Sequence, residues 1–343
     1  MPATIRDVAG ASGVHVSTVS RTFSAPHLVN AETRTRVLAA AESMGYRPNR
    51  AARALITGRT GNIGLIVADI ANPFFPPLIK AAESQARQRD CHVFVADTNE
   101  DPLVEEELVQ ALAKQVDGIV LCSPRMSNSA IERLAHDVPL VVVNRLVSGL
   151  PAVVMDVAHG ARLAIDHLAL LGHRELALLG GPRGSWTSRE MRRAATTTAR
   201  SGGVNLTVVG PNAPTEHGGM AAAEQVLRTG ATAVLAYNDL MAIGLMEGLH
   251  TRGVDVPRDI SVIGIDDIAL SRLVRPKLTT VATPTAAAGR AAVDMLLQHG
   301  DDRRTTAQVT LQTVLVTRDS TGPAPSSSTV DSRSGLVASF VKE

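Results

Sequence analysis

Residues 4–56 read TIRDVAGASGVHVSTVSRTFSAPHLVNAETRTRVLAAAESMGYRPNRAARALI and predict a small unit of three short helices. Thr4 and Asp7 have the spacing of a capping box, so the first helix is expected to begin at Ile5. Asn30 is a suitable N-cap for the third helix, and Gly45 is suited to end it. The expected core residues of this third helix are Val37, Leu38, Ala41 and Met44.

The second helix, expected over residues 16–23, has the pattern of the reading helix of a helix-turn-helix motif. Val19 and Phe23 are four residues apart and can pack inward together. An arginine on the outer side can donate two hydrogen bonds to guanine, whereas a valine offers only apolar contact, for instance to a thymine methyl group. The side chains expected on this outer side are Val16, Ser17, Ser20 and Arg21, with Thr18 and Ser20 placed to contact phosphate or to cap locally.

The charge of the first 60 residues points to the same kind of partner. They contain eight arginines, no lysine and three acidic residues, a net charge of +5, whereas the whole chain of 343 residues carries only +1. Such asymmetry favours a polyanion such as DNA as partner of the N-terminal segment. Taken alone, it is also compatible with arginines scattered over a solvated surface.

The rest of the chain alternates short apolar runs with amphipathic stretches. Repeated units of this kind predict parallel sheets covered by helices on both faces, arranged either as one large sheet or as two lobes. Strands are expected from residues 63, 91, 118, 140, 175, 233 and 260. Helices are expected over residues 74–90, 103–115, 158–172, 217–229 and 239–252.

Gross composition limits the remaining classes. A hydrophobic content of 45% over 343 residues is enough to fill two or three domains. The N-terminus has no signal-like segment and no run approaches the ~18 apolar residues of a membrane span, so a cytoplasmic protein that does not contact the membrane is predicted. Cys91 and Cys122 lie in apolar runs and are expected to be buried and unpaired.

Several segments together resemble the lactose-repressor/galactose-repressor (LacI/GalR) family of bacterial transcription regulators. They are TIRDVAGASGV, STVSR, ETRTRVLAAAESMGYRPNRAARAL and GNIGLIVADIANPFF, and the resemblance extends from Thr4 to about Pro323. It implies an all-α helix-turn-helix headpiece over residues 1–47, a hinge helix and linker over 48–60, and a two-lobed α/β core with parallel sheets, like that of periplasmic binding proteins, over 61–323.

Within that core, the resemblance implies three chain crossings between the lobes, near residues 156, 284 and 318. Lobe 1 would then comprise about 61–156 and 285–317, and lobe 2 about 157–284 and 318–323. The serine-rich tail over 324–343 has no leucine heptads, so it is expected to be disordered and the protein to be a dimer.

The hinge segment is too short to form a stable helix alone, so it is expected to fold only with a partner. By resemblance it folds on the operator, where Leu55 is expected to enter the minor groove, Ala52 to allow close approach, and Arg50 and Arg53 to lie near phosphates. The alternative is that Leu55 packs on the headpiece. The full expected DNA-contacting set is Thr4, His15, Val16, Ser17, Thr18, Ser20, Arg21, Asn49, Arg50, Ala52, Arg53 and Leu55. His15 departs from the serine usual in the family and is expected to weaken the cap of the reading helix.

A small-molecule effector, sugar-like by resemblance, is expected in the cleft at the carboxyl ends of the strands. Carboxylates, amides and arginines beside an aromatic ring suit a ligand rich in hydroxyl groups. The expected contacts are Asp69, Phe74, Arg145, Asp156, Trp186, Arg189, Asn238 and Asp266. Trp186 is expected to replace the stacking aromatic that the family often carries near Ala213, whereas Asn72, Asp239 and Asp267 are expected to cap helices.

No pattern in the chain indicates catalysis. The dinucleotide-binding glycine fingerprint, the P-loop and the GxSxG elbow are absent, and His159, His167 and His173 lack metal-pair spacing. No catalytic residue, metal or cofactor is therefore expected, and these histidines are expected at the surface or in caps. The predicted function is that of a homodimeric regulator, expected to repress, that binds a pseudo-palindromic DNA operator under effector control. The alternative is a small-molecule-binding protein whose cleft, not DNA binding, carries the function.

Overall fold

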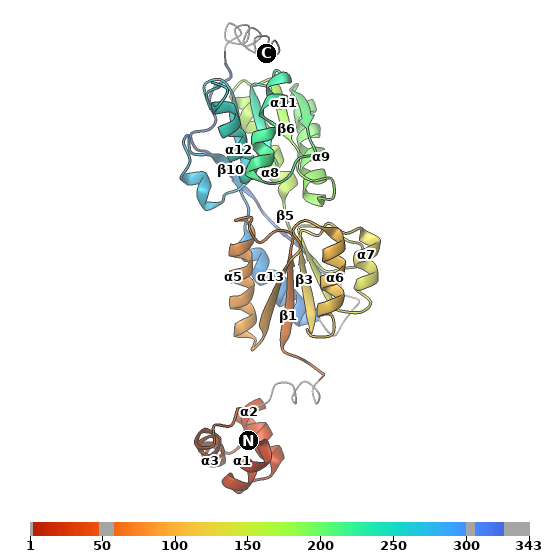
Figure 1. The fold of residues 1–343 in the computed structure, drawn as a ribbon, viewed down its shortest axis with the longest axis vertical. Coiled ribbons are helices and arrows are strands. Elements are labelled where there is room, and N and C mark those ends of the chain that lie inside the picture. The colour runs from red at the N-terminus through yellow and green to blue at the C-terminus, as the bar shows by residue number, and fades with distance from the viewer. Residues whose placement is uncertain (1–2, 48–57, 300–305, 326–343) are drawn as a thin grey trace. The chain divides into compact units, whose positions relative to one another are not determined.

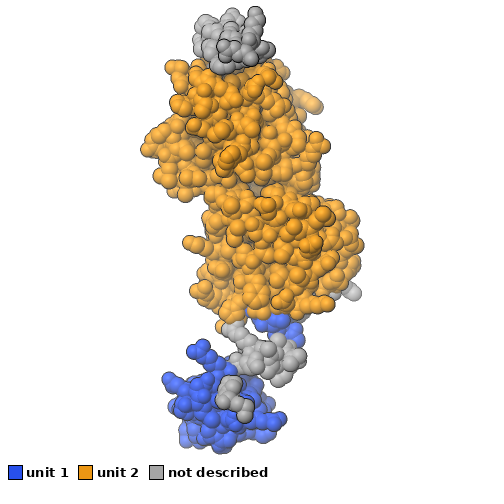
Figure 2. All heavy atoms as spheres, viewed as in Figure 1, with its two compact units in different colours: residues 1–61 blue, residues 62–343 orange. Residues whose placement is uncertain are grey.

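The computed structural model describes residues 3–47, 58–299 and 306–325 of the chain. Contacts divide the chain into two compact units, Met1–Gly61 and Asn62–Glu343, which are coloured separately in Figure 2. No helix among the described residues is long and apolar enough to cross a membrane.

The first unit contains the three predicted helices. They are α1 (Ile5–Ser12), α2 (Val16–Ser24) and α3 (Ala31–Ser43), with a short 3-10 helix, η1 (Pro26–Leu28), before α3. The capping box is confirmed, because the Thr4 amide donates to Asp7 Oδ2 at 2.8 Å and the Asp7 amide donates to Thr4 Oγ1 at 3.4 Å. The buried residues of its small core are Val8, Ala9, Val19, Val37 and Ala41.

Two residues expected in this core are not in it. Leu38 is 43% exposed and Met44 is 38% exposed. Val37 and Ala41, four residues apart, occupy the buried stripe of α3, so Leu38 is turned about 100° away from it. Met44 lies at the C-cap, beyond the last helical residue Ser43.

The second unit is built on two six-stranded sheets, which define its two lobes (Figure 1). The sheet of lobe 1 has the order β11-β5-β4-β3-β1-β2, and that of lobe 2 has the order β12-β10-β9-β8-β6-β7. Every strand pairing recorded among the described residues is parallel except that of β10 with β12. The central strands are buried along their whole length, as expected when helices cover both faces.

The elements of lobe 1 are β1 (Asn62–Val67), α5 (Phe75–Gln88), β2 (His92–Asp97), α6 (Pro102–Leu112), β3 (Gly118–Cys122), α7 (Asn128–Leu134), β4 (Leu140–Val143), β5 (Ala152–Met155), α13 (Thr285–His299) and β11 (Gln308–Leu311). The elements of lobe 2 are α8 (Val157–Leu170), β6 (Glu175–Leu179), α9 (Trp186–Ser201), β7 (Asn205–Val209), α10 (Glu216–Ala221), α11 (Ala223–Arg228), β8 (Ala233–Ala236), α12 (Asp239–His250), β9 (Ser261–Asp266), the 3-10 helix η2 (Ala269–Arg272), β10 (Thr279–Ala282) and β12 (Val314–Val316).

Two of the three expected chain crossings lie where the sequence places them, at Asp156 and at residues 283–284. The third does not, because β12 (Val314–Val316) already pairs with β10 in the sheet of lobe 2. This crossing therefore falls at residues 312–313, not near 318. Hydrogen bonds join two of the crossing segments, since the Asp156 amide donates to Leu311 O at 2.8 Å and Thr313 Oγ1 donates to Asp156 O at 2.9 Å.

One helix pair in each lobe packs closely enough to require glycine. In lobe 1, α5 lies beside α13, and a Cβ atom on Gly289 would lie 2.4 Å from Leu78 O (Figure 1). In lobe 2, α10 crosses α12, and a Cβ atom on Gly244 would lie 1.8 Å from Glu216 O. Real Cβ atoms do not approach backbone oxygens this closely, so each of these two helix contacts requires a residue without a side chain.

Candidate functional site

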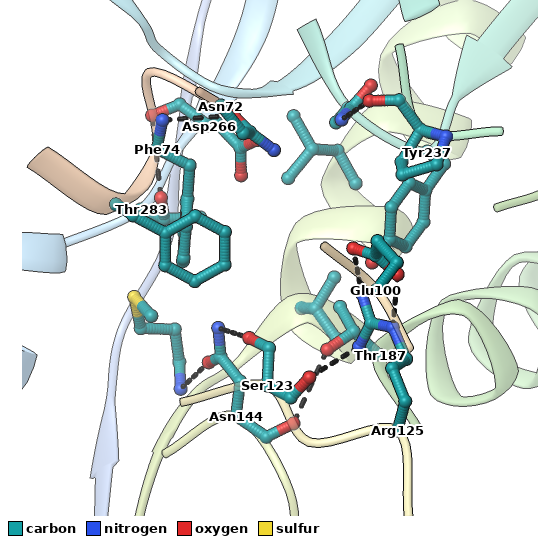
Figure 3. Close-up of a pocket in the computed structure, with 16 residues that line it drawn as sticks. Asn72, Phe74, Glu100, Ser123, Arg125, Asn144, Thr187, Tyr237, Asp266 and Thr283 are labelled. Atoms are coloured by element: carbon teal, nitrogen blue, oxygen red, sulfur yellow. Dashed lines mark hydrogen bonds and ion pairs between the residues drawn. The ribbon is translucent and has the colours of Figure 1, made fainter. Parts of the chain in front are cut away.

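The described pocket lies between the two lobes, where the carboxyl ends of the strands of both sheets meet. This is where open α/β sheets place their ligands. Its empty volume is about 540 Å³, including space open to solvent. It is lined by Asn72, Phe74, Phe75, Glu100, Ser123, Arg125, Asn144, Met155, Val157, Thr187, Pro214, Tyr237, Asn238, Ile265, Asp266 and Thr283 (Figure 3).

An ion pair forms the wall that lobe 1 contributes. Arg125 Nε donates to Glu100 Oε2 at 2.5 Å and Arg125 Nη2 donates to Glu100 Oε1 at 2.8 Å, a bidentate arrangement. Arg125 Nη1 donates to Ser123 O at 2.6 Å. The Arg125 side chain is only 7% exposed, against 24% for Glu100. All three guanidinium nitrogens of Arg125 therefore already have an acceptor within lobe 1.

A second glutamate, Glu105, holds the loop that carries Arg125. Glu105, on α6, is 2% exposed and its Oε2 accepts hydrogen bonds from the amides of Arg125 and Met126, both at 2.9 Å. Burial raises the pKa of Glu105, while the two amides and the positive charges of Arg125 and Arg145 act in the opposite direction. The loop that carries Arg125 is thus held by a buried side chain.

Lobe 2 contributes carboxyl, amide and phenol groups. Asn238 is largely used for structure, since its Oδ1 accepts from the Met241 amide at 2.9 Å and its Nδ2 donates to Pro214 O at 2.9 Å. Tyr237 is held by a hydrogen bond of 3.0 Å between its hydroxyl and Ser185 Oγ. Among the described residues, no hydrogen bond to the Asp266 carboxyl group is recorded. Burial, and then the charge of Asp239, raise the pKa of Asp266.

Behind Asp266, Asp239 is fully buried at the start of α12. Its carboxyl group accepts hydrogen bonds from Thr280 Oγ1 at 2.5 Å, Ser271 Oγ at 2.6 Å and the Ile268 amide at 2.9 Å. Burial outweighs these bonds and raises the pKa of Asp239 to about 6. The capping role expected for Asp239 is wrong, because Asn238 caps α12 and the Asp239 carboxyl group instead bonds to residues of other segments next to the pocket.

Unusual backbone conformations gather at this pocket. Four lining residues other than glycine have positive φ: Glu100 at 65°, Ser123 at 53°, Asn144 at 60° and Asp266 at 123°. Each follows or ends a strand, namely β2, β3, β4 and β9. Such conformations cost of order 1–3 kcal/mol each and cluster at functional sites, where the surrounding structure imposes them. The strain supports assignment of this pocket as a ligand site.

Of the eight residues predicted to bind an effector, three line the pocket: Phe74, Asn238 and Asp266. Phe74 is 8% exposed and packs edge-to-face on Phe75, with ring centroids 4.9 Å apart. In Figure 3, Phe74, Asp266 and Thr283 lie on one side of the pocket, and Glu100, Arg125 and Tyr237 on the other.

Arg145 is close to the pocket but is turned into the protein. It is 4% exposed, and its guanidinium group donates to Pro124 O, Met126 O and Asn128 Oδ1. Burial and the neighbouring charge of Arg189 lower the pKa of Arg145, but an arginine remains protonated. Arg145 therefore positions the loop after β3 and is not among the lining residues.

The other four predicted contacts lie outside the lining residues. Asp69 Oδ1 accepts from the Ala71 amide at 2.9 Å, and Asp156 Oδ1 caps α8 by accepting from the His159 amide at 2.8 Å. Trp186 is half-buried as the first residue of α9, so its proposed stacking role is not supported by the lining. Arg189 is exposed, and its recorded hydrogen bond is to Arg183 O at 3.5 Å.

Most of the polar lining residues were not predicted individually. Glu100, Ser123, Arg125, Thr187 and Thr283 lie in loops or helix starts after strands, and Tyr237 directly follows β8. The available signal was their position just beyond a strand, which Asn238 and Asp266 share.

In the headpiece, Ser17, Ser20 and Arg21 are exposed on α2, as predicted for a reading surface. Thr4 is exposed at the start of α1. Val16 differs from the prediction, because it is half-buried and packs against the small core. Thr18 is half-buried as well.

His15, which was predicted to weaken the cap of the reading helix, supplies that cap with its ring. Its Nδ1 atom accepts from the Ser17 amide at 3.3 Å and lies 2.9 Å from Ser17 Oγ. A ring nitrogen thus takes the place of the serine oxygen expected there. The predicted hinge contacts Asn49, Arg50, Ala52, Arg53 and Leu55 lie outside the described residues, as does most of the predicted tail.

The histidines and cysteines have structural environments. His173 is fully buried, not at the surface as predicted, and its ring contacts Thr232 Oγ1, Ser261 Oγ and Gly322 O, because the chain after β12 folds back over it. His167 Nε2 lies 3.1 Å from Thr321 Oγ1. Neither cysteine forms a disulfide, and Cys122 is buried while Cys91 is half-buried. No cluster of three potential metal ligands occurs within the described parts of the chain.

Comparisons with known proteins match two separate parts of the chain to two family models. Residues 4–49 match the model of bacterial regulatory proteins of the lacI family, and residues 165–321 match that of a periplasmic binding protein-like domain. The HTH-type transcriptional regulator GalS of Salmonella typhimurium is 33% identical over 303 residues, which span 86% of this chain and 89% of that protein.

Solved structures agree in fold. The Lac repressor dimer bound to operator and the anti-inducer ONPF matches with a TM-score of 0.84 and 28% identity, covering 94% of this chain and all of that one. A LacI family transcriptional regulator from Enterococcus faecium with bound ribose matches with a TM-score of 0.69 and 28% identity, covering 76% of this chain and 99% of that one.

Proposed function

Since this chain belongs to the LacI family of bacterial regulatory proteins, we propose that it represses transcription by binding a pseudo-palindromic operator as a homodimer, under control of a small-molecule effector. The observation that carries the proposal is that one chain combines an exposed helix-turn-helix surface with a strained, polar pocket between two lobes.

On the DNA side, α2 presents Ser17, Ser20 and Arg21 without needing to rearrange. Arg21 is suited to guanine, and the serines to phosphate or to a base edge. Two such helices related by a two-fold axis read two half-sites, which is why a pseudo-palindrome is expected. Leu55 and Ala52 of the hinge segment are proposed, from sequence, to enter the minor groove between the half-sites. Because its target is DNA, we place the protein in the cytoplasm.

On the effector side, the lining combines one aromatic face with carboxyl, amide and hydroxyl groups. Phe74 can stack on an apolar ring face, while Glu100, Asn144 and Asp266 can bond hydroxyl groups at its edge. This is the recognition chemistry of a sugar or a similar polyhydroxylated metabolite. That a family member of the same fold holds ribose supports this class. We propose no catalytic role for these residues.

The proposed coupling works through the three segments that cross between the lobes. A ligand that contacts both lobes changes their relative arrangement, and this changes how the two headpieces of a dimer are presented. The coupling free energy expected for such a system is about 1–3 kcal/mol and is reciprocal between DNA and effector.

Selection of binding sites from random duplex DNA by the purified full-length protein tests the DNA half of the proposal. Enrichment of a two-fold symmetric site, whose affinity falls steeply with salt, is expected. Sugars are then added to the complex with that site, and a several-fold change in affinity is expected for at least one. If the folded protein enriches no site with or without sugars, the regulator proposal is wrong and the pocket alone carries the function.

A further inference from the structure

The charges around the pocket are unevenly distributed. Among the described lining residues, the charged or ionisable acidic and basic side chains are Glu100, Arg125 and Asp266. Arg125 is the one cation, and both of its forked donors are taken by Glu100. A carboxylate entering this pocket would therefore have to compete with a carboxylate that is already covalently fixed in place.

The two carboxyl groups lie on opposite sides of the pocket (Figure 3). An anionic group of a ligand placed between them faces Glu100 on one side and Asp266 on the other. Asp266 repels an anion when it is ionised, and when it is protonated it offers one neutral hydrogen-bond donor but no positive charge. Each oxygen of Glu100 still has a second lone pair to accept a hydroxyl hydrogen.

The two arginines predicted to bind the effector do not change this balance. Arg145 directs its guanidinium group to Pro124 O, Met126 O and Asn128 Oδ1 in the interior of lobe 1. Arg189 is exposed and is not among the lining residues. Neither side chain is placed to bond an anion held next to Phe74.

The backbone holds Glu100 in this position. Glu100 has φ of 65° and follows Asn99 at 48°, so two consecutive residues other than glycine adopt left-handed conformations. The Glu100 amide donates to Ala68 O at 2.6 Å, which ties this strained turn to the segment after β1. Strain of this kind persists only where the surrounding structure imposes it. The position of the carboxylate is thus built into the fold.

We propose that Glu100 is a specificity-determining residue that neutralises Arg125 and thereby restricts the pocket to uncharged polyhydroxylated effectors, excluding their phosphorylated and acidic derivatives. The inference rests on the proposed effector function and narrows its ligand class. It predicts that removal of the Glu100 charge exposes a guanidinium group able to bind an anion.

The test uses matched pairs of ligands that differ in charge. Calorimetry with the full-length protein at constant ionic strength compares glucose with glucose 6-phosphate and with glucuronate, galactose with galacturonate, and ribose with ribose 5-phosphate. Each neutral sugar that binds is expected to bind at least about tenfold more tightly than its anionic partner. An anionic partner that binds as tightly or more tightly overturns the inference while leaving the effector function intact. Binding of no probe by the folded protein overturns the proposed sugar effector itself.

Variants then assign the selectivity to Glu100. Glu100→Gln keeps the shape of the side chain and is expected to raise affinity for the anionic partner at least about tenfold relative to the unmodified protein. Glu106→Gln is the matched control, because Glu106 is also a glutamate of lobe 1 but pairs with Arg133 at the surface, at 2.9 Å. It should change neither affinity. Equal gains in both variants would show a general charge effect and contradict the role of Glu100.

A double variant protects the test against misfolding. Glu100→Gln leaves a largely buried guanidinium without its counter-charge, which is a destabilising change. Glu100→Gln combined with Arg125→Met removes both charges, and this variant is expected to gain no affinity for anions, although loss of the Glu100 carboxylate weakens its binding of neutral sugars. Gain of anion binding in the double variant would show that Arg125 is not the group that Glu100 neutralises.

Discussion

The two lobes share an order of strands but differ in the partners of their buried charged groups. In lobe 1, Glu100 lies against Arg125, and Glu105 lies beneath the loop that carries Arg125. In lobe 2, Asp239 is buried with two hydroxyl groups and one amide as its partners, and Asp266 faces the pocket beside it. The pKa of Asp239 is raised to about 6 because neutral donors do not offset burial.

The difference indicates a division of roles. In lobe 1, bidentate hydrogen bonds and the buried Glu105 hold the ion pair in place, so lobe 1 provides a fixed wall. In lobe 2, Asp239 has a pKa raised to about 6 and gains a proton at mildly acidic pH, so the stability of this lobe is coupled to protonation.

The largest expected effect comes from the tightest packing in lobe 2. Gly244→Ala places a methyl group where its carbon would lie 1.8 Å from Glu216 O, so α10 and α12 must move apart. We expect a loss of roughly 3 kcal/mol in the free energy of unfolding, the upper part of the range for overpacking. Urea unfolding measures this loss. Glu247→Ala, at an exposed position of the same helix, is the control and should change it by less than about 0.5 kcal/mol.

An unchanged unfolding midpoint for Gly244→Ala would mean that the helices of lobe 2 adjust freely. That result would contradict the interpretation that glycine is required where α10 crosses α12.

In lobe 1 the corresponding weak point is Glu105. Glu105→Ala leaves the amides of Arg125 and Met126 without their acceptor in a buried place, at an expected cost of about 2–3 kcal/mol. Glu106→Ala, the adjacent change, breaks only a surface ion pair with Arg133, which is 63% exposed, and should cost less than about 1 kcal/mol. Urea unfolding compares the two variants, and similar costs for both would contradict a supporting role for Glu105.

The third prediction concerns protons and lobe 2. The folded-state pKa of Asp239 is raised from 3.8 to about 6, so the folded protein binds more protons than the unfolded chain between these values. Ionisation of this group therefore removes stability as the pH rises through that window, and protonation restores it. Asp239→Asn cannot ionise, so its cost relative to the unmodified protein should be about 1 kcal/mol larger at pH 5 than at pH 7.

Urea unfolding of both proteins at pH 5, 6 and 7 measures this difference, and contributions from carboxylates that do not interact with Asp239 cancel between them. A cost independent of pH would show that Asp239 titrates normally. The difference between the lobes would then have no effect on how the free energy of unfolding depends on pH.

The sequence predicts regular elements better than it predicts the site, for physical reasons. Six of the seven predicted strands are apolar runs inside the sheets, such as β3 and β8, whose residues are buried, and the seventh, β2, is an edge strand. Unpredicted β7 is at a sheet edge, and its residues Asn205–Val209 are mostly exposed, so its pattern is weakly apolar. Unpredicted β12 has only three residues, and its pairing partner β10 is more than 30 residues earlier in the chain.

Side-chain direction was the harder part of the site. Asp266 and Asn238 were predicted because they end or follow strands, and parallel strands bring their carboxyl ends together. Arg145 has the same kind of position, but three oxygens from the loop after β3 turn it inward. Glu100 and Arg125 are 25 residues apart in the sequence, and no local pattern predicts that they form an ion pair.

The smallest expected effect concerns which of two arginines, Arg125 of lobe 1 or Arg189 of lobe 2, belongs to the effector site. The resemblance to the LacI/GalR family predicts that Arg189 of lobe 2 binds the effector, whereas the structure places Arg125 of lobe 1 in the lining and leaves Arg189 exposed. A solvated cation outside the pocket contributes little to binding of a neutral ligand, so Arg189→Ala should change sugar affinity less than about twofold. Calorimetry with a neutral sugar that binds the unmodified protein measures it, with Arg193→Ala on the same helix as control. Loss of binding in Arg189→Ala alone would mean that α9 turns this arginine inward when the pocket is filled, and the cation of the site would then belong to lobe 2.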